Sequence, residues 1–393
     1  DVVMVDNNSS DGSSQYVSQH YPTVRLIQIH ENVGFAQGNN IAAREARGKY
    51  LALLNNDMKV DRQWLSKLVE AIQTKDDIAC VGSKIMTWEG DEIDFFGGMI
   101  NFYGMGFQLD DQDINDNTLQ EVLFACGGSM LIKRDIFIDV GGFDESYFAY
   151  FEDVDVGWRL WLLGYLVLLT PQALAYHRGH ATGKTFASER RSLLYERNAL
   201  YTIIKNYSDE VLNRVLPVAL LLTARRSFMM TKACKDEFRL ETQPLSTILS
   251  SVAKKGKLPA EGHYLRELKI LFKEHGIIAA GKEIIRLIAR WLYIHSVLQI
   301  MRDVALVPKV SLSPLLALDD LAETLPQVWA KRKAIQKRRV RRDEEILPLF
   351  KGPFHPHPPD PVYLELQQQL ACLFQVDQVF QQPDKQGRDN VNL

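Results

Sequence analysis

Short apolar runs alternate with amphipathic segments over residues 2–86, and this alternation constrains the fold more than any other feature. The apolar runs predict strands at residues 2–5, 24–29, 50–54 and 79–86, with helices at residues 14–20, 41–47 and 61–74. That order of elements is typical of a mainly parallel sheet with helices on both faces. We therefore predict an α/β fold.

Polar residues follow the first three predicted strands, at residues 6–14, 31–40 and 55–57. In open α/β sheets, ligands bind beyond the carboxyl ends of the strands. Turn chemistry alone would account for any one of these clusters. Three of them at one edge of the sheet favour a ligand site.

The first two clusters suit a nucleotide. The carboxylates of Asp6 and Asp11 can accept hydrogen bonds from a nucleobase or a ribose. Gly34 and Gly38 would let backbone amides approach a phosphate before a helix, although their spacing is not that of a dinucleotide-binding loop.

The third cluster suits a metal ion. Asn55 and Asp57 place a neutral and a charged oxygen two residues apart at a strand end. Magnesium and manganese ions that bridge phosphates are held by few protein oxygens of this kind.

An acidic helix start is predicted after the aromatic run at residues 147–151. Glu152, Asp153 and Asp155 stand where a helix dipole favours negative charge. A carboxylate in half-apolar surroundings can have a proton affinity suited to a general base. The alternative is structural, with Asp155 and Arg159 forming an ion pair along the helix.

Four ordered motifs carry a resemblance to a known family. They are VDNNSSDGS, ENVGFAQGNN, LLNND and GGSMLIKRDIFIDVGGFDESYFAYFEDVDVGWRLWLLGY. Together they resemble glycosyltransferase family 2, whose fold is GT-A, and most closely its rhamnosyltransferase-like branch of bacterial surface-polysaccharide enzymes. The resemblance covers about residues 1–205. The family's opening strand is expected to lie before Asp1 and is missing from this sequence.

The resemblance implies roles for particular residues. Asp153 matches the catalytic base, with Glu152 as the alternative. A divalent metal cofactor, Mg or Mn, would be held by Asp57, and His177 is a candidate to complete its site. Asn55 stands at the first position of the family's Asp-x-Asp motif. The residues expected to bind the nucleotide-sugar are Asp6, Asp11, Gly34, Phe35, Gly38, Asn40, Asn55 and Asp57.

The segments around these motifs support less specific expectations. Residues 87–123 predict a hairpin and loop that either shape the acceptor side, as the resemblance implies, or face solvent. Gly127 and Gly128 would let a sugar lie against backbone. Short strands are predicted at residues 166–169 and 173–177, and residues 182–185 could close over the diphosphate.

The second half of the sequence is mainly helical. Helices are predicted from Ser188 onward and at residues 212–222, 277–298 and 315–329. The basic amphipathic segment 277–298 would either lie in a membrane interface or pack on the catalytic domain. The predicted domains are a GT-A catalytic domain at 1–205, a helical and possibly membrane-associating region at 206–350, and a Pro-rich linker, short helix and disordered tail at 351–393.

A basic run at residues 331–342 holds eight Lys and Arg residues. It is either a solvated helix face or a contact for anionic lipid head groups or a pyrophosphate-linked acceptor. No aromatic residues interleave with these charges, so nucleic acid is not expected as a partner. Arg197 and Asn198 match a feature of the same family branch, with no role evident from the sequence.

The net charge and the cysteine spacing exclude some classes of protein. The net charge of -3 argues against a general polyanion binder. The four cysteines are far apart, which favours a reducing compartment over a disulfide scaffold or zinc site. No apolar run reaches the ~20 residues that a membrane span requires. We expect a cytoplasmic protein, with peripheral contact to the inner face of the membrane as an option.

The favoured function is a nonprocessive, inverting glycosyltransferase that moves rhamnose or a similar sugar from a nucleotide-diphosphate donor to a glycan or lipid-linked acceptor. The Gln-x-x-Arg-Trp motif of processive synthases does not occur in the sequence. The alternatives are a nucleotidyltransferase and a noncatalytic sugar-nucleotide-binding scaffold. Glu152 and Asp153 would be unexplained in a nucleotidyltransferase. Asp57 and Asp153 argue against a scaffold, because a binding module has no need of a base.

Overall fold

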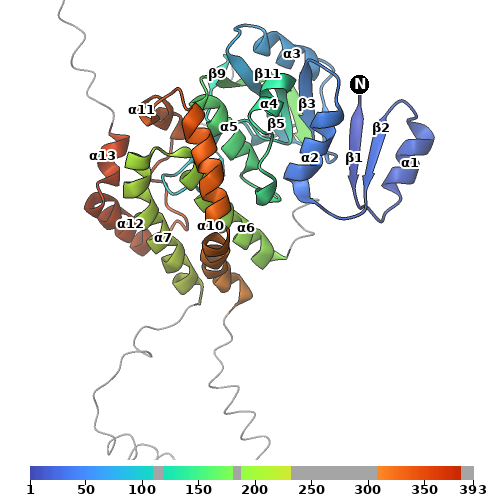
Figure 1. The fold of residues 1–393 in the computed structure, drawn as a ribbon. Helices are drawn as coiled ribbons and strands as arrows, with labels where there is room; N and C mark the ends of the chain where they lie inside the picture. The colour runs from blue at the N-terminus through green and yellow to red at the C-terminus, as the bar shows by residue number, and fades with distance from the viewer. Residues whose placement is uncertain (109–117, 180–186, 232–307, 382–393) are drawn as a thin grey trace, which may run out of the picture. The chain divides into compact units, whose positions relative to one another are not determined.

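A computed structural model describes residues 1–108, 118–179, 187–231 and 308–381. The described residues up to 230 and those at 309–381 belong to one folded unit. Strands and helices alternate in its first part, and helices dominate the remainder (Figure 1). The predicted α/β class, with a helical C-terminal region, is confirmed.

The main sheet is mixed in direction. Its central path, in spatial order, is β3 (Tyr50–Leu54), β10 (Ser129–Lys133), β5 (Ile78–Thr87), β11 (Leu166–His177) and β4 (Met58–Val60), with β6 (Ile93–Phe95) on β5 and β9 (Gln120–Glu121) on β11. Strands β3, β5 and β11 point one way, while β10 is antiparallel to both β3 and β5. The expectation of a mainly parallel sheet is corrected here, because an apolar run such as that of β10 carries no mark of direction.

Two further pairs of strands complete the sheets. β1 (Val3–Asn7) and β2 (Arg25–Ile29) form a separate parallel pair, and β7 (Gly98–Ile100) and β8 (Gly106–Gln108) form a hairpin. The first pair carries α1 (Ser13–His20), and α2 (Gly34–Glu45) packs on β1 (Figure 1). The strands predicted at residues 166–169 and 173–177 are one strand, β11, with an irregularity after Thr170.

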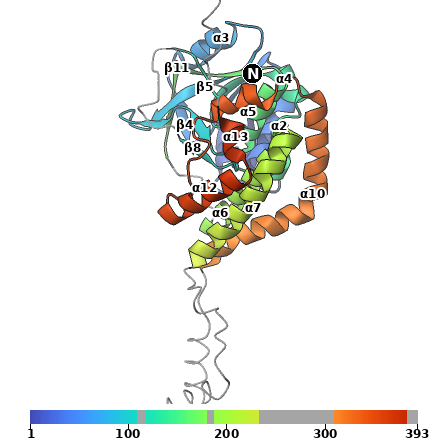
Figure 2. The same cartoon turned by 90° about the vertical axis from the view of Figure 1, so that its left-hand side faces the viewer.

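Helices cover the main sheet and build the second part of the unit. They are α3 (Trp64–Ile72), α4 (Arg134–Asp139), α5 (Glu152–Leu162), α6 (Ser188–Asn206), α7 (Asp209–Thr231), α10 (Ser313–Arg338), α11 (Asp343–Ile346), α12 (Pro361–Leu373) and α13 (Val376–Phe380). Helix α10 packs along α6 and bends along its length, with Pro326 inside it (Figure 2). The helices predicted at residues 212–222 and 315–329 are confirmed, whereas residues 277–298 lie outside the described part. In the described part, no helix is long and apolar enough to cross a bilayer.

The apolar core runs under the sheet. Trp64, Leu68 and Ile72 of α3 are buried against it, as the helical spacing of these residues predicts. The indole Nε1 of Trp64 donates hydrogen bonds to the hydroxyls of Ser83 and Ser129, so the polar group of this large side chain is satisfied.

The Pro-rich stretch near residue 355 is anchored to the β7–β8 hairpin. Asn101 donates a hydrogen bond from its side chain to the carbonyl of His355, and the backbone amide of Phe102 donates to Pro353. The ring of His355 lies edge-on to Phe107, with 4.5 Å between centroids. The last part of the chain therefore packs on the segment inserted between β5 and β10.

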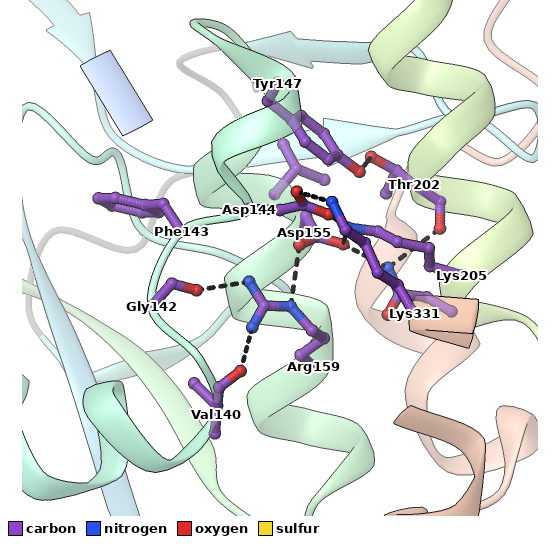
Figure 3. Close-up of polar contacts among 12 residues, drawn as sticks. Val140, Gly142, Phe143, Asp144, Tyr147, Asp155, Arg159, Thr202, Lys205 and Lys331 are labelled. Atoms are coloured by element: carbon purple, nitrogen blue, oxygen red, sulfur yellow. Dashed lines mark hydrogen bonds and ion pairs between the residues drawn. The ribbon is translucent and has the colours of Figure 1, made fainter. Parts of the chain in front are cut away.

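A buried ion network joins α5, α6 and α10 (Figure 3). Lys205, only 1% exposed, contacts Asp144 at 2.6 Å and Asp155 at 2.9 Å. Arg159 donates from Nε to Asp155 at 2.8 Å, and Lys331 of α10 pairs with Asp144. Burial opposes ionisation of Asp144, but Lys205 and Lys331 outweigh it and hold the pKa of Asp144 well below its usual range.

Replacement of Lys205 by Met tests this network. We expect Lys205→Met to lower the free energy of unfolding by about 3–5 kcal/mol, because two buried carboxylates lose a cation. Urea denaturation would measure the loss. The control is Arg214→Met, which removes an ion pair to the exposed Glu210 and should cost at most about 1 kcal/mol. Equal losses in both variants would contradict a special role for Lys205.

Candidate active site

The backbone turn at Gly127 and Gly128 joins three of the predicted motifs. The Gly127 amide donates a hydrogen bond to Asp153 Oδ2 at 3.0 Å, and the Asn55 amide donates to the Gly128 carbonyl at 2.9 Å. A Cβ on Gly127 would lie 3.3 Å from the ring of Phe35. One on Gly128 would lie 3.0 Å from Nδ2 of the Asn55 side chain. The turn therefore requires small residues, because side chains from three motifs crowd against it.

An aromatic loop, residues 147–151, leads into the acidic first turn of α5, which contacts the Gly127 turn. Phe148, Tyr150 and Phe151 have φ values of 64°, 71° and 67°. Positive φ is a left-handed conformation that costs a non-glycine residue roughly 1–3 kcal/mol. The rings of Tyr150 and Phe151 lie edge-on to Tyr195 of α6, with centroids 4.7 and 5.6 Å apart. These packed rings line the approach to Glu152, the first residue of α5.

Glu152 and Asp153 differ in their surroundings. Glu152 is buried, and among the residues that the structure describes none forms a hydrogen bond with its Oε2. Burial, together with the neighbouring charge of Asp153, raises the pKa of Glu152 well above its usual range. Burial also raises the pKa of Asp153, although hydrogen bonds from the amides of Gly127 and Val154 work against that shift. Asp153 is the less enclosed of the two.

The predicted metal ligands lie together. His177 Nε2, at the end of β11, is 3.4 Å from Asp57 Oδ2, and His177 Nδ1 is 2.8 Å from Asp94 Oδ2. The Arg178 amide also donates to the Asp57 carbonyl at 2.9 Å, which fixes the turn after β3 against the end of β11. Carboxylate oxygen and imidazole nitrogen are donors that manganese accepts. Over the described residues, no group of three or more His, Cys, Asp or Glu side chains forms a complete metal site, so substrate oxygens would have to supply the other ligands.

The two carboxylates of the first cluster cap the loop after β1. Burial opposes ionisation of Asp6, but hydrogen bonds from Ser14 and Ser9 outweigh it and keep its pKa below the usual value. Asp11 is exposed, and hydrogen bonds from Ser13 lower its pKa. Both side chains are therefore ionised acceptors at neutral pH.

The second cluster lies on a helix rather than in a loop. Helix α2 begins at Gly34, seven residues before the predicted start at residue 41, so Gly34, Phe35, Gly38 and Asn40 all belong to it. The sequence signal is weak there because two glycines and two asparagines disfavour a helix, and contacts from outside the helix override that preference. The Ala36 amide, for example, donates to the Phe148 carbonyl at 3.2 Å.

Asn40 is held by the turn that follows α4. Its side chain donates to the Phe143 carbonyl at 2.8 Å and accepts from the Phe143 amide at 2.9 Å. Gly141 and Gly142 make a tight turn beside it, with φ values of 88° and 66°. Asn40 therefore fixes the turn on which the aromatic loop depends, and its buried amide is occupied by that contact.

Two residues near the site had no role in the sequence interpretation. Asp94 contacts His177 from 83 positions away, and its acidic surroundings in sequence gave no signal for that pairing. Asn198 was visible only as a family feature, yet its side chain donates to three carbonyls of the aromatic loop. The segment predicted to close over the diphosphate, residues 182–185, lies outside the described part.

The basic run at residues 331–342 is largely used within the protein. Lys331, Arg332, Arg338 and Arg339 form ion pairs with carboxylates of the same unit, and Arg341 donates to carbonyls at residues 164 and 165. The run is therefore not simply the solvated helix face of the first alternative, and these contacts leave fewer of its charges for lipid head groups.

Comparison with known proteins identifies the class. Residues 1–141 match the family model described as Glycosyl transferase family 2. The first part of this chain is thus similar to glycosyltransferase family 2 domains, and the enzyme class predicted from the motifs, a glycosyltransferase, is confirmed. The match ends before α5, so Glu152 and Asp153 lie outside it.

The chain is also similar to individual proteins. The chain is 29% identical over 213 residues to an N-acetylglucosaminyl-diphospho-decaprenol L-rhamnosyltransferase of Mycobacterium tuberculosis, covering 48% of this chain and 69% of that protein. It is 29% identical over 198 residues to the O-antigen biosynthesis protein RfbC of Myxococcus xanthus, covering 48% of this chain but only 16% of that protein. A solved structure of GalNAc-T7 with UDP, GalNAc and Mn2+ has a TM-score of 0.45 and 16% identity, covering 70% of this chain and 51% of that one.

The buried Glu152 gives a testable pH dependence. Its pKa is raised in the folded state, so its contribution to stability is full below the ordinary glutamate value of 4.5 and is lost as pH rises through the raised value. We expect Glu152→Gln to melt at a higher temperature than the wild type at about pH 8, with the difference vanishing at about pH 4. Thermal unfolding across this range measures it, with the exposed Glu365→Gln as control. A gain in melting temperature that is the same at both pH values would disprove a raised pKa for Glu152.

Proposed function

We propose that this chain is a nonprocessive, inverting transferase that moves rhamnose or a similar sugar from a nucleotide-diphosphate donor. The observation that carries the proposal is the turn at Gly127 and Gly128, where the base candidate Asp153 meets Phe35 and Asn55. One motif for the sugar-nucleotide, one for the metal and one for proton transfer thus converge on a single piece of backbone.

Asp153 is the proposed general base. It would accept the proton of the acceptor hydroxyl while that oxygen attacks the anomeric carbon, and the nucleoside diphosphate leaves from the opposite side. The raised pKa of Asp153 increases its basicity. Its side chain is only half-buried, so an acceptor can reach it. Glu152, the alternative base, is buried, so an acceptor would reach it less readily.

Asp57 and His177 are the proposed metal ligands on the protein side. A bound Mg or Mn ion would offset the charge on the diphosphate leaving group. Asp94 would orient the ring of His177 by accepting a hydrogen bond from its Nδ1–H. His177 Nε2 then faces Asp57. Asp6, Asp11 and the start of α2 would contact the nucleoside and the sugar.

The acceptor is proposed to be a glycan or a lipid-linked sugar. The mycobacterial relative is named for a decaprenol-linked diphosphate acceptor, and the aromatic loop with Tyr195 offers flat apolar surface beside Asp153. Work on such a substrate would place the protein on the cytoplasmic side of a membrane, with peripheral contact as the simplest arrangement.

Release of nucleoside diphosphate from a donor panel tests the proposal. UDP-, dTDP- and GDP-sugars would be incubated with the full chain and manganese, with and without a lipid-linked glycan. We expect release from one donor, lowered at least about 100-fold in Asp153→Asn with nucleotide binding unchanged. In the wild type the rate should fall as pH drops through the raised pKa of Asp153, because only the ionised form accepts a proton.

The matched control is Asp135→Asn, which changes an exposed carboxylate on α4. It should keep the wild-type rate. Release that survives Asp153→Asn would refute the base assignment. Tight nucleotide binding without release from any donor, with acceptor present, would favour the binding-scaffold alternative.

Manganese affinity tests the metal ligands without relying on turnover. Calorimetry with manganese and UDP or dTDP should show binding lost in Asp57→Asn. Binding should be weakened about 10–100-fold in Asp94→Asn, which removes the carboxylate charge next to His177 Nδ1. Asp91→Asn, in the same segment but exposed, is the control and should bind as the wild type. Unchanged manganese binding in Asp57→Asn would exclude this site.

A further inference from the structure

The backbone carbonyls of the aromatic loop are all accounted for. The Phe148 carbonyl accepts from the Ala36 amide of α2, and the Phe151 carbonyl accepts from the Asp155 amide within α5. The carbonyls of Ala149 and Tyr150 accept from the side chain of Asn198 in α6. The same side chain donates to the Tyr147 carbonyl, which also accepts from the Ala149 amide at 2.7 Å and from Arg197. One buried amide therefore contacts three of the five carbonyls of a loop whose backbone is strained.

The geometry of Asn198 is that of a clamp. Its Nδ2 lies 3.1 Å from the Tyr147 carbonyl, 2.9 Å from the Ala149 carbonyl and 2.8 Å from the Tyr150 carbonyl. The amide has two hydrogens, so three acceptors share them. Its Oδ1 accepts from the guanidinium of Arg197 at 3.2 Å, which fixes the orientation of the amide. Asn198 is fully buried and contacts neither Glu152 nor Asp153 in these hydrogen bonds.

The loop ends where the base begins. Phe151 is the last residue before α5 and has a left-handed backbone conformation, and Asp153 is the second residue of the helix. A change in the backbone of residues 149–151 would rotate the first turn of α5 and displace the carboxylate of Asp153 from the Gly127 amide. The position of that carboxylate therefore depends on hydrogen bonds made by a different helix.

We propose that Asn198 is the positioning residue of this enzyme, which holds the aromatic loop in the one conformation that aims Asp153 at the acceptor. This inference rests on the proposed function of Asp153 as the base. Asn198 acts through backbone and does not touch the reacting atoms. Only an amide meets the requirement, because a carboxylate of the same shape would direct oxygen at three carbonyl oxygens.

Proteolysis tests the clamp without any measure of activity. Chymotrypsin cuts after aromatic residues, and the loop contains four of them, at positions 147, 148, 150 and 151. In Asn198→Asp and Asn198→Ala, we expect cleavage within residues 147–151 to be at least about tenfold faster under native conditions, since a clamped loop resists local opening. Peptide mass mapping would locate the cuts.

Kinetics then show whether the clamp serves the base. With the donor panel described above, Asn198→Asp should lower turnover about 100-fold, the loss expected for a catalytic group misplaced by about 1 Å. The nucleotide dissociation constant should change by less than about threefold, because the donor contacts lie on other elements. The pH at which the rate falls to half should also shift, since the Gly127 hydrogen bond to Asp153 weakens.

A matched variant separates positioning from general loss of stability. Gln367 is another fully buried amide, which donates to the Phe354 carbonyl and accepts from Tyr103. Gln367→Ala should lower the melting temperature comparably, while the loop cleavage rate, the turnover and the pH profile stay as in the wild type. If the Asn198 variants behave as Gln367→Ala does, the inference is wrong.

The two proposals can fail separately. Faster loop cleavage in Asn198→Asp, together with full activity in Asp153→Asn, would keep the clamp and refute the base. Turnover lost in Asp153→Asn, together with unchanged cleavage, turnover and pH profile in both Asn198 variants, would keep the base and refute the clamp.

Discussion

The site depends on a backbone conformation that the chain does not favour locally. Three aromatic residues within four positions hold positive φ, at a cost of roughly 1–3 kcal/mol each. Such a loop persists only where its surroundings determine it fully. Here the determining contacts come from three directions, namely the amide of Ala36, the side chain of Asn198 and the ring of Tyr195. The position of Asp153 is thus a tertiary property.

The buried ion network explains why the helices that supply these contacts keep their places. Lys205 of α6 connects Asp144, just before the loop, with Asp155 of α5, just after it. Buried ion pairs add little net stability compared with apolar packing, but removal of one member is costly. A network of that kind discriminates strongly against shifted arrangements of α5 and α6. It therefore sets the register between the helix that carries the base and the helix that carries the clamp.

Much of this architecture was predictable from the sequence, and the exceptions have physical causes. Strand β3 was predicted at its observed bounds because apolar residues bounded by polar turns carry a local signal. The sequence of β10 contains no local signal for its direction, because that direction depends on which strands pair. The start of α2 was predicted late because its stability comes from the loop at Phe148 rather than from helix propensity. Asp57 and His177 were paired by resemblance, whereas Asp94 could be found only from the folded chain.

Gly34 was singled out from the sequence, but the structure requires a glycine there for a different reason. From the sequence, a glycine there suggested room for a phosphate to approach the backbone. In the structure, Gly34 has φ of 85°, and a Cβ would lie 2.5 Å from the Phe148 carbonyl oxygen. The glycine is therefore already required by the aromatic loop, whether or not a phosphate binds. The same carbonyl accepts the Ala36 hydrogen bond, so the close packing of α2 on this one peptide group is what demands a glycine at position 34.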